Sequence, residues 1–123
     1  MIRVHDYIDA ARDRPFRWGR HDCIIFAGGW IEARIGLRLV PSYQSLRDGR
    51  SLLADVSPRA VLDDALTSVP VLMSQTGDVV ELPSDTGMPA FGIVCGGGNV
   101  AGFVGRRIGF VELTGAIRAW RVG

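Results

Sequence analysis

The feature that most constrains the fold is a change in sequence pattern near residue 76. Before it, apolar residues recur at helical spacing; after it come short runs rich in β-branched residues, separated by glycine. These runs are GDVVELP, FGIVCGGG, NVAGFVG, IGFVEL and AIRAWRV, with CGGGN and VGRR as turns. Because the helices precede the strands, the sequence predicts an α+β domain whose N-terminal helices pack on a C-terminal antiparallel meander of four to five strands.

Two helices are predicted in the first third of the chain. An apolar stripe opposite Arg and Asp predicts a helix over residues 2–12. A second helix, over residues 23–35, opens near Asp22 and is apolar around most of its circumference, which predicts burial on most sides. Gly28 and Gly29 in its middle each lower helix stability by about 1 kcal/mol relative to alanine. We therefore expect another backbone to pack closely against them.

The middle of the chain carries weaker signals. Residues 42–56 predict a short helix that is interrupted at Gly49. Ser57 followed by Pro58 has the pattern of an N-cap and a first helical residue, so a further helix is expected to begin there. No chemical motif is evident in either segment.

Composition excludes several classes of protein. The length of 123 residues fits one domain over residues 1–123, with one modest core. The formal net charge is +1, all 14 basic residues are arginine, and no basic block stands out, so we expect no nucleic-acid partner. No apolar run is long enough to span a bilayer and no signal peptide is evident, so we expect no membrane partner and synthesis in the cytoplasm without a leader.

The chemical candidate is Cys23, one of two cysteines that we expect to be free thiols. Two cysteines are too few for a disulfide framework or a zinc site, and we expect no metal and no cofactor. At the first turn of a helix, free N–H groups and the helix dipole favour a thiolate and lower its pKa. Nucleophilic catalysis also needs a base, normally a histidine, within hydrogen-bond reach.

The pattern around this cysteine resembles a known family. W-G-x-x-D-C before an apolar helix, then G-D-V-V, then a strand of the form x-x-G-I-x-x-G, is similar to the NlpC-type cell-wall cysteine peptidases. The similarity runs from Trp18 to about Gly102. It implies a compact papain-like domain of the kind that cleaves peptide cross-links in peptidoglycan. The RWGRHDC and AIRAWRV segments also resemble small proteins in the tail gene clusters of phages and gene-transfer agents.

Transferring the family pattern gives a nucleophile without a base. The resemblance assigns Cys23 to the nucleophile and Asp22 to the acidic residue before it, with Trp18–Gly19 in the preceding loop and Gly77–Asp78 as the G-D element. Aligning the strand that contains Gly92 and Ile93 places Ala90 at the catalytic histidine position.

The neighbours of that position offer no substitute within the strands. Phe91 beside it cannot accept a proton, and the following strand offers only the polar Asn99 at its start. Of the two histidines, His21 on the loop before Cys23 is the candidate replacement base. His5 is expected to be a surface or packing residue. Cys23 is therefore either a vestigial or a working nucleophile.

Three functions remain open on this basis. The one we favour is a virion structural protein of a phage or gene-transfer-agent tail tip or baseplate. It would be a pseudoenzyme on a degenerate NlpC-like fold. We expect it in the virion tail, with hub and distal-tail proteins as partners. The first alternative is an active peptidoglycan endopeptidase using Cys23, with His21 or a partner's residue as base. The second is a peptidoglycan-binding module without hydrolysis.

Arg106 and Arg107, in a turn, are expected to be solvated or to serve a protein contact.

Overall fold

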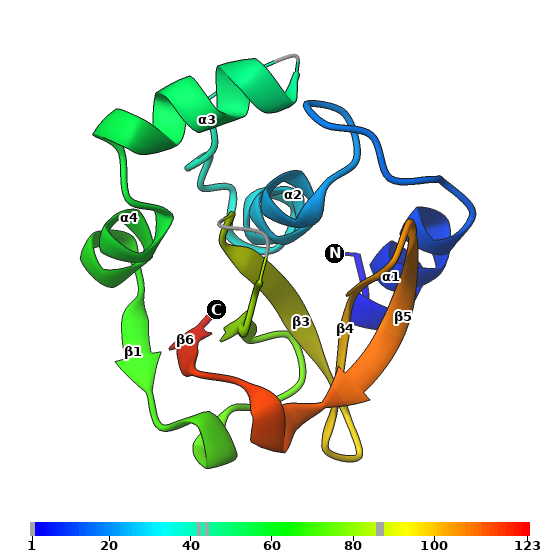
Figure 1. The fold of residues 1–123 in the computed structure, drawn as a ribbon. Helices are drawn as coiled ribbons and strands as arrows, with labels where there is room; N and C mark the ends of the chain where they lie inside the picture. The colour runs from blue at the N-terminus through cyan, green and yellow to red at the C-terminus, as the bar shows by residue number, and fades with distance from the viewer. Residues whose placement is uncertain (1, 42, 44, 86–87) are drawn as a thin grey trace.

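The computed structural model describes residues 2–41, 43, 45–85 and 88–123 (Figure 1). The helices are α1 (Val4–Arg12), α2 (Cys23–Ile35), α3 (Leu46–Asp55) and α4 (Pro58–Ala65), with 3-10 turns η1 (Val71–Met73) and η2 (Leu113–Gly115). The strands are β1 (Thr67–Val69), β2 (Val79–Leu82), β3 (Ala90–Gly96), β4 (Asn99–Val104), β5 (Arg107–Glu112) and β6 (Arg118–Arg121). None of the helices in the described ranges is long and apolar enough to cross a membrane.

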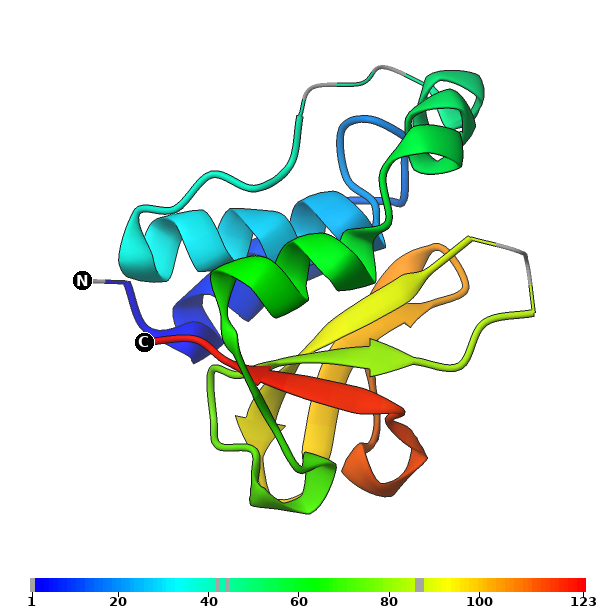
Figure 2. The same ribbon diagram turned by 90° about the vertical axis from the view of Figure 1, so that its left-hand side faces the viewer.

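The strands form one antiparallel sheet in the order β1-β6-β2-β3-β4-β5. In Figure 2, α2 and α4 lie over one face of this sheet. The α+β class, with N-terminal helices on a C-terminal antiparallel sheet, is confirmed. The strand count and the simple meander are wrong in detail: the described chain has six strands, and β6 pairs between β1 and β2. At three residues, β1 is too short to give a period-two pattern.

Helix α2 begins after Asp22, as the sequence predicts, and ends at Gly36. The Asp22 carboxylate accepts a hydrogen bond from Ile25 N at 2.9 Å, and Gly36 ends the helix with φ of 73°, in the left-handed region. The expected backbone contact at the two central glycines is wrong, because side chains fill the space. A Cβ on Gly28 would clash with Val40, and one on Gly29 would lie 2.5 Å from the Tyr7 hydroxyl.

The two helices of the middle segment differ in how well they were predicted. The Ser57 side chain accepts a hydrogen bond from Ala60 N at 3.3 Å, with Pro58 following it, so the predicted start of α4 is confirmed. The predicted interruption of α3 at Gly49 is wrong, because the helix runs through it. Gly49 is buried, and a Cβ there would lie 3.3 Å from the ring of Tyr43. The glycine therefore admits a neighbouring ring and does not break the helix.

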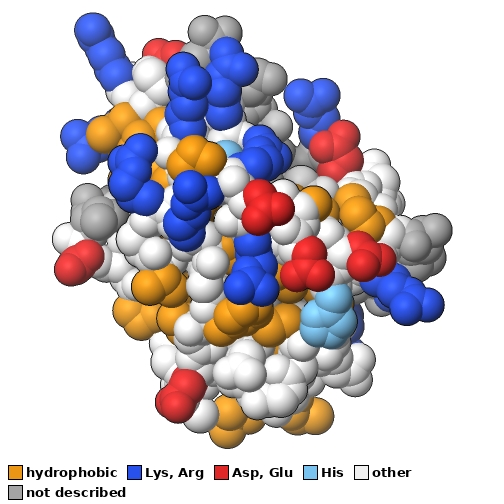
Figure 3. Space-filling view, turned by 90° about the vertical axis from the view of Figure 1, so that its right-hand side faces the viewer, with side chains coloured by type: hydrophobic (Ala, Val, Ile, Leu, Met, Phe, Trp, Pro, Cys, Tyr) orange, Lys and Arg blue, Asp and Glu red, His pale blue; other side chains and the backbone are white. Residues whose placement is uncertain are grey.

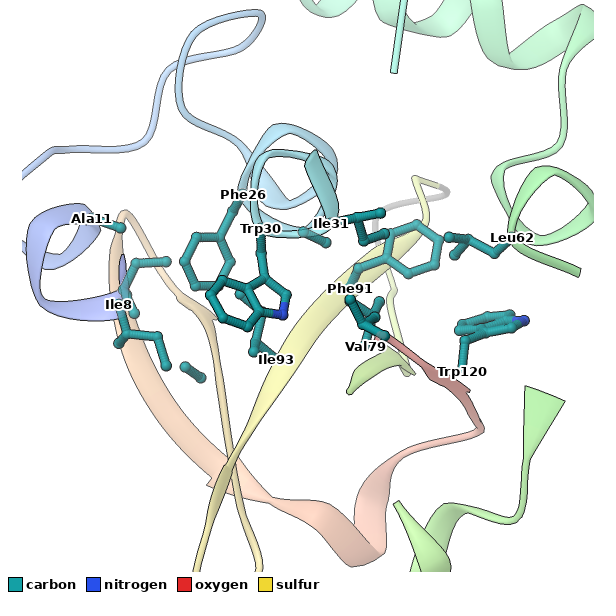
Figure 4. Close-up of a cluster of buried hydrophobic side chains, with 14 residues drawn as sticks. Ile8, Ala11, Phe26, Trp30, Ile31, Leu62, Val79, Phe91, Ile93 and Trp120 are labelled. Atoms are coloured by element: carbon teal, nitrogen blue, oxygen red, sulfur yellow. The ribbon is translucent and has the colours of Figure 1, made fainter. Parts of the chain in front are cut away.

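The core lies between the helices and the sheet (Figure 4). Phe26 and Trp30 of α2 point toward the sheet, each 1 % exposed, and Trp120 of β6 is fully buried. Phe91 of β3 lies between α2 and Leu62 of α4. A second, smaller cluster covers the opposite face of the sheet, formed by Val80, Val94, Val100, Leu113 and Ala119.

Hydrogen bonds of Gly77 and Asp78, which precede β2, connect the sheet to α2 and to residues 121 and 122. The indole N–H of Trp30 donates to the Gly77 carbonyl at 2.7 Å. Asp78, 1 % exposed, accepts from Arg121 Nε at 3.1 Å and from Val122 N at 3.1 Å. This carboxylate therefore fixes the position of β6 beside β2.

Candidate functional site

Cys23 occupies the first turn of α2 and lies against the beginning of β3. Its side chain is buried, with 9 % of the residue exposed. The Sγ–H donates to the Pro89 carbonyl at 3.2 Å, and the Phe91 backbone also hydrogen-bonds the sulfur. Ala90 lies between these two residues and is the first residue of β3. The position that the resemblance assigns to the catalytic histidine is therefore next to the sulfur, and it carries a methyl group.

A buried carboxylate holds the loop that precedes Cys23. Asp22 is fully buried and accepts from Gly19 N at 3.0 Å, from Ile25 N at 2.9 Å and from the Tyr43 hydroxyl. Burial and the hydrogen bond to Asp22 raise the pKa of Tyr43, so the phenol remains a donor. Sequence reasoning missed Tyr43, because nothing in the local sequence indicates its contact with a residue 21 positions earlier.

The environment of Cys23 favours the neutral thiol. Burial raises the pKa of Cys23 to about 11, and the Asp22 charge acts in the same direction. The backbone hydrogen bonds at the sulfur favour the thiolate but are outweighed. The expected lowering of the pKa by the helix N-terminus is wrong for this residue, because desolvation of a thiolate exceeds the effect of the helix end.

We expect Cys23 to react slowly with iodoacetamide. In a Cys95→Ala variant, the rate should rise about tenfold per pH unit from neutral pH and level off only near the Cys23 pKa of about 11, since only the thiolate attacks. Intact-mass spectrometry at a series of pH values measures this rate. The Cys23→Ala variant reports Cys95 alone as the control. A rate that is already constant between about pH 6 and 9 would contradict the result, because an activated thiolate behaves in that way.

His21 faces away from the sulfur. It is 4 % exposed, its Nε2 hydrogen-bonds the Ala11 carbonyl at 2.9 Å, and its ring packs edge-on against Phe103 with centroids 5.0 Å apart. Burial lowers the pKa of His21. His5 lies exposed on α1. Within the described residues, which include both histidines of the chain, no hydrogen bond joins an imidazole to Cys23.

The other polar candidate is also remote. Asn99 begins β4 and pairs with Gly96, at the opposite end of β3 from Ala90. Six residues of strand correspond to about 20 Å, so Asn99 cannot orient a group beside Cys23. No group of three His, Cys, Asp or Glu side chains in the described ranges could hold a metal ion.

An open groove lies close to the sulfur but does not reach it. Its volume is about 510 Å³, and its walls come from α3, the start of α4 and the segment before β3. The lining residues are Arg50, Leu53, Ala54, Ser57, Pro58, Met88 and Pro89. Pro89 lines the groove and also accepts the Cys23 hydrogen bond, so it stands between a ligand in the groove and the sulfur.

An apolar cavity of about 70 Å³ lies behind the site, among α2, α3, α4 and Phe91. Its walls are almost entirely hydrocarbon, and they include Tyr43 and Gly49. A dry space of this kind offers no polar group for substrate chemistry. We assign it to imperfect packing between α3 and the rest of the domain.

A comparison with solved structures shows the fold, and a family model matches nearly the whole chain. A family described as "Domain of unknown function (DUF6950)" matches residues 2–122. The crystal structure of the NlpC/p60 domain of peptidoglycan hydrolase SagA superposes with a TM-score of 0.67 and 16 % sequence identity, covering 96 % of this chain and 95 % of that chain. No curated protein matches the sequence. The domain therefore has the NlpC-like fold that the sequence pattern indicated.

Proposed function

Since this chain belongs to the DUF6950 domain family and has an NlpC-like fold, we propose that it is a catalytically inactive relative of the peptidases, serving as a structural component of a phage or gene-transfer-agent tail tip or baseplate. The observation that carries the inactivity is the state of the sulfur. Cys23 donates its S–H to the Pro89 carbonyl, while His21 bonds the Ala11 carbonyl.

Amide hydrolysis by a cysteine requires a thiolate and a group that protonates the leaving amine. A thiol whose pKa is raised to about 11 is almost entirely protonated at neutral pH. The residue between its two backbone partners is Ala90, which can neither accept nor donate a proton. The geometry therefore supports a protein that uses the fold as a scaffold.

The tail assignment is supported by sequence resemblance. The RWGRHDC and AIRAWRV segments resemble small proteins of tail gene clusters. We propose hub and distal-tail proteins as partners and the virion tail as the location, with assembly in the host cytoplasm. Size-exclusion chromatography of the protein with each tail protein of its own gene cluster tests this. A protein that stays monomeric with every one of them contradicts the assignment.

We expect no cell-wall lysis in a zymogram cast with purified peptidoglycan. Wild type, Cys23→Ala and the control Cys95→Ala should all leave the gel uncleared, because neither histidine hydrogen-bonds the sulfur in the described part of the chain. Release of soluble peptide fragments, measured by mass spectrometry, provides a second readout. Clearing by wild type and Cys95→Ala that is absent in Cys23→Ala would establish an active endopeptidase instead.

A second candidate is a wall-binding module that does not hydrolyse. The groove beside Pro89 favours it, because the groove is open to solvent and is lined by Arg50 together with apolar residues such as Leu53 and Pro58. Such a site suits a short peptide with a carboxylate end. Cosedimentation with insoluble peptidoglycan that is lost in Arg50→Ala, without fragment release, would support this candidate over the structural role.

A further inference from the structure

Six arginines that are separated in the sequence lie on one face of the molecule. They come from the end of α1, the loop before α2, the turn between β4 and β5 and the first residue of β5, and we call them the arginine face. Its members are Arg12, Arg14, Arg17, Arg20, Arg106 and Arg107, all exposed. Figure 3 shows arginine side chains gathered over the upper part of this side of the molecule. The sequence indicated no basic block, because the fold brings the two segments together.

Backbone hydrogen bonds hold the two segments in place. Phe16 N donates to the Arg106 carbonyl at 2.8 Å, and the Arg106 side chain donates to the Phe16 carbonyl at 3.3 Å. The Arg107 guanidinium donates to the Asp13 carbonyl at 2.8 Å. The loop therefore follows the β4–β5 turn in a fixed register, and the arginines hold a defined arrangement.

The charges on this face are not neutralised from within. In the described part of the chain, the face has one ion pair, between Arg12 and Asp9 at 3.9 Å, and both side chains are more than half exposed. Other guanidiniums of the face hydrogen-bond neutral groups: Arg14, Arg106 and Arg107 donate to backbone carbonyls. Exposed positive charge of this density attracts anionic groups.

An exposed aromatic ring lies at the edge of the face. Phe110 of β5 is 48 % exposed, and the Arg12 guanidinium lies over its ring, 5.3 Å from the centroid. Arginine and aromatic side chains together are enriched in protein–protein interfaces, where an apolar centre is surrounded by charged and polar groups. We propose that the arginine face docks a protein whose contact surface is rich in Asp and Glu and places an apolar side chain against Phe110.

Two observations favour a protein over a nucleic acid. The carboxylates of Asp9 and Asp13 are exposed at this face and would repel a continuous phosphate backbone, whereas a protein can place other groups opposite them. Single-stranded nucleic acids also need exposed rings for base stacking. The rings of Phe16 and Trp18 instead pack edge-to-face, with centroids 4.8 Å apart. This inference depends on the proposed structural role in one respect, which is that both expect a protein partner.

The test reverses the charge of two side chains that do not stabilise the fold. The exposed side chains of Arg17 and Arg20 make no hydrogen bond or ion pair among the described residues, so the Arg17→Glu/Arg20→Glu variant should fold normally, which circular dichroism checks. The matched control is Arg3→Glu/Arg47→Glu, which makes the same change in net charge at exposed positions outside the face. The probes are a polyglutamate peptide carrying one tryptophan, its glutamine counterpart, and single- and double-stranded DNA oligonucleotides of similar length.

Binding is measured by fluorescence anisotropy at about 0.15 M salt, where distant charges are screened. We expect wild type to bind the glutamate peptide and not the glutamine peptide. The face variant should bind the glutamate peptide about tenfold more weakly, and the control variant should bind like wild type.

Three results would overturn the inference. An equal loss in the control variant would assign binding to net charge alone. DNA that binds more tightly than the glutamate peptide would assign the face to nucleic acid. Absence of peptide binding even at low salt would remove the docking surface. None of these results would contradict the proposal of an inactive scaffold, because lysis of peptidoglycan is measured separately. Lysis, in turn, would not contradict the proposal for the arginine face.

Discussion

Replacing Asp22 with alanine should lower the free energy of unfolding by about 3 to 5 kcal/mol. The carboxylate is fully buried and accepts hydrogen bonds from Gly19 N, Ile25 N and the Tyr43 hydroxyl. Loss of an N-cap costs about 1 kcal/mol, and each buried donor left without a partner costs about 1 to 3 kcal/mol. Urea denaturation followed by tryptophan fluorescence measures the change.

The control for this prediction is Asp48→Ala. Asp48 is exposed in the first turn of α3, and its loss should change the free energy of unfolding by less than about 0.5 kcal/mol. Tyr43→Phe removes a single donor to Asp22 and should fall between the two variants. If Asp22→Ala lowered the free energy of unfolding by no more than Asp48→Ala does, water would have to satisfy the three donors. The loop before Cys23 would then not depend on this carboxylate.

The second large effect is expected for Trp30→Ala, which should lower the free energy of unfolding by about 3 to 5 kcal/mol. The indole is 1 % exposed at the centre of the core, next to Phe26 and Ile93, and truncation leaves a cavity as well as losing apolar burial. The Gly77 carbonyl also loses its donor. Thermal or urea unfolding measures the loss, which is a large fraction of the stability of a domain of this size.

Trp30→Phe separates the two contributions. Phenylalanine keeps much of the ring volume but removes the N–H that bonds Gly77, so its loss should be clearly smaller than that of the alanine variant. Equal losses in the two variants would mean that the hydrogen bond to the Gly77–Asp78 element, and not the packing of α2, dominates at this position.

The parts of the fold that the sequence predicted are those determined by local interactions. Asp22 and Gly36 mark the ends of α2 because their capping bonds reach only three or four residues along the chain. The Ser57–Pro58 pair predicts α4 for the same reason. Gly49 misled the prediction of α3, since the glycine is required by the ring of Tyr43, and a tertiary contact of that kind leaves no periodic signal.

The site was predicted in position but not in chemical state. The pattern before α2 placed Cys23 correctly at a helix N-terminus. The raised pKa of Cys23 depends chiefly on burial, and the sulfur is buried against residues as distant as Pro89, 66 positions away, so no local pattern could indicate it. The direction of His21 is likewise set by the Ala11 carbonyl and the Phe103 ring, which belong to elements on either side.

The place of β6 in the sheet has a consequence for biosynthesis. The strand formed by Arg118–Arg121 separates β1 from β2, so neither of these can acquire its full set of backbone partners until residues 118–121 have been translated. Pairings between distant parts of a chain also form slowly. During translation, β1 and β2 would therefore keep unpaired strand edges until β6 emerges from the ribosome, and a chain stopped before Arg118 could not complete its sheet.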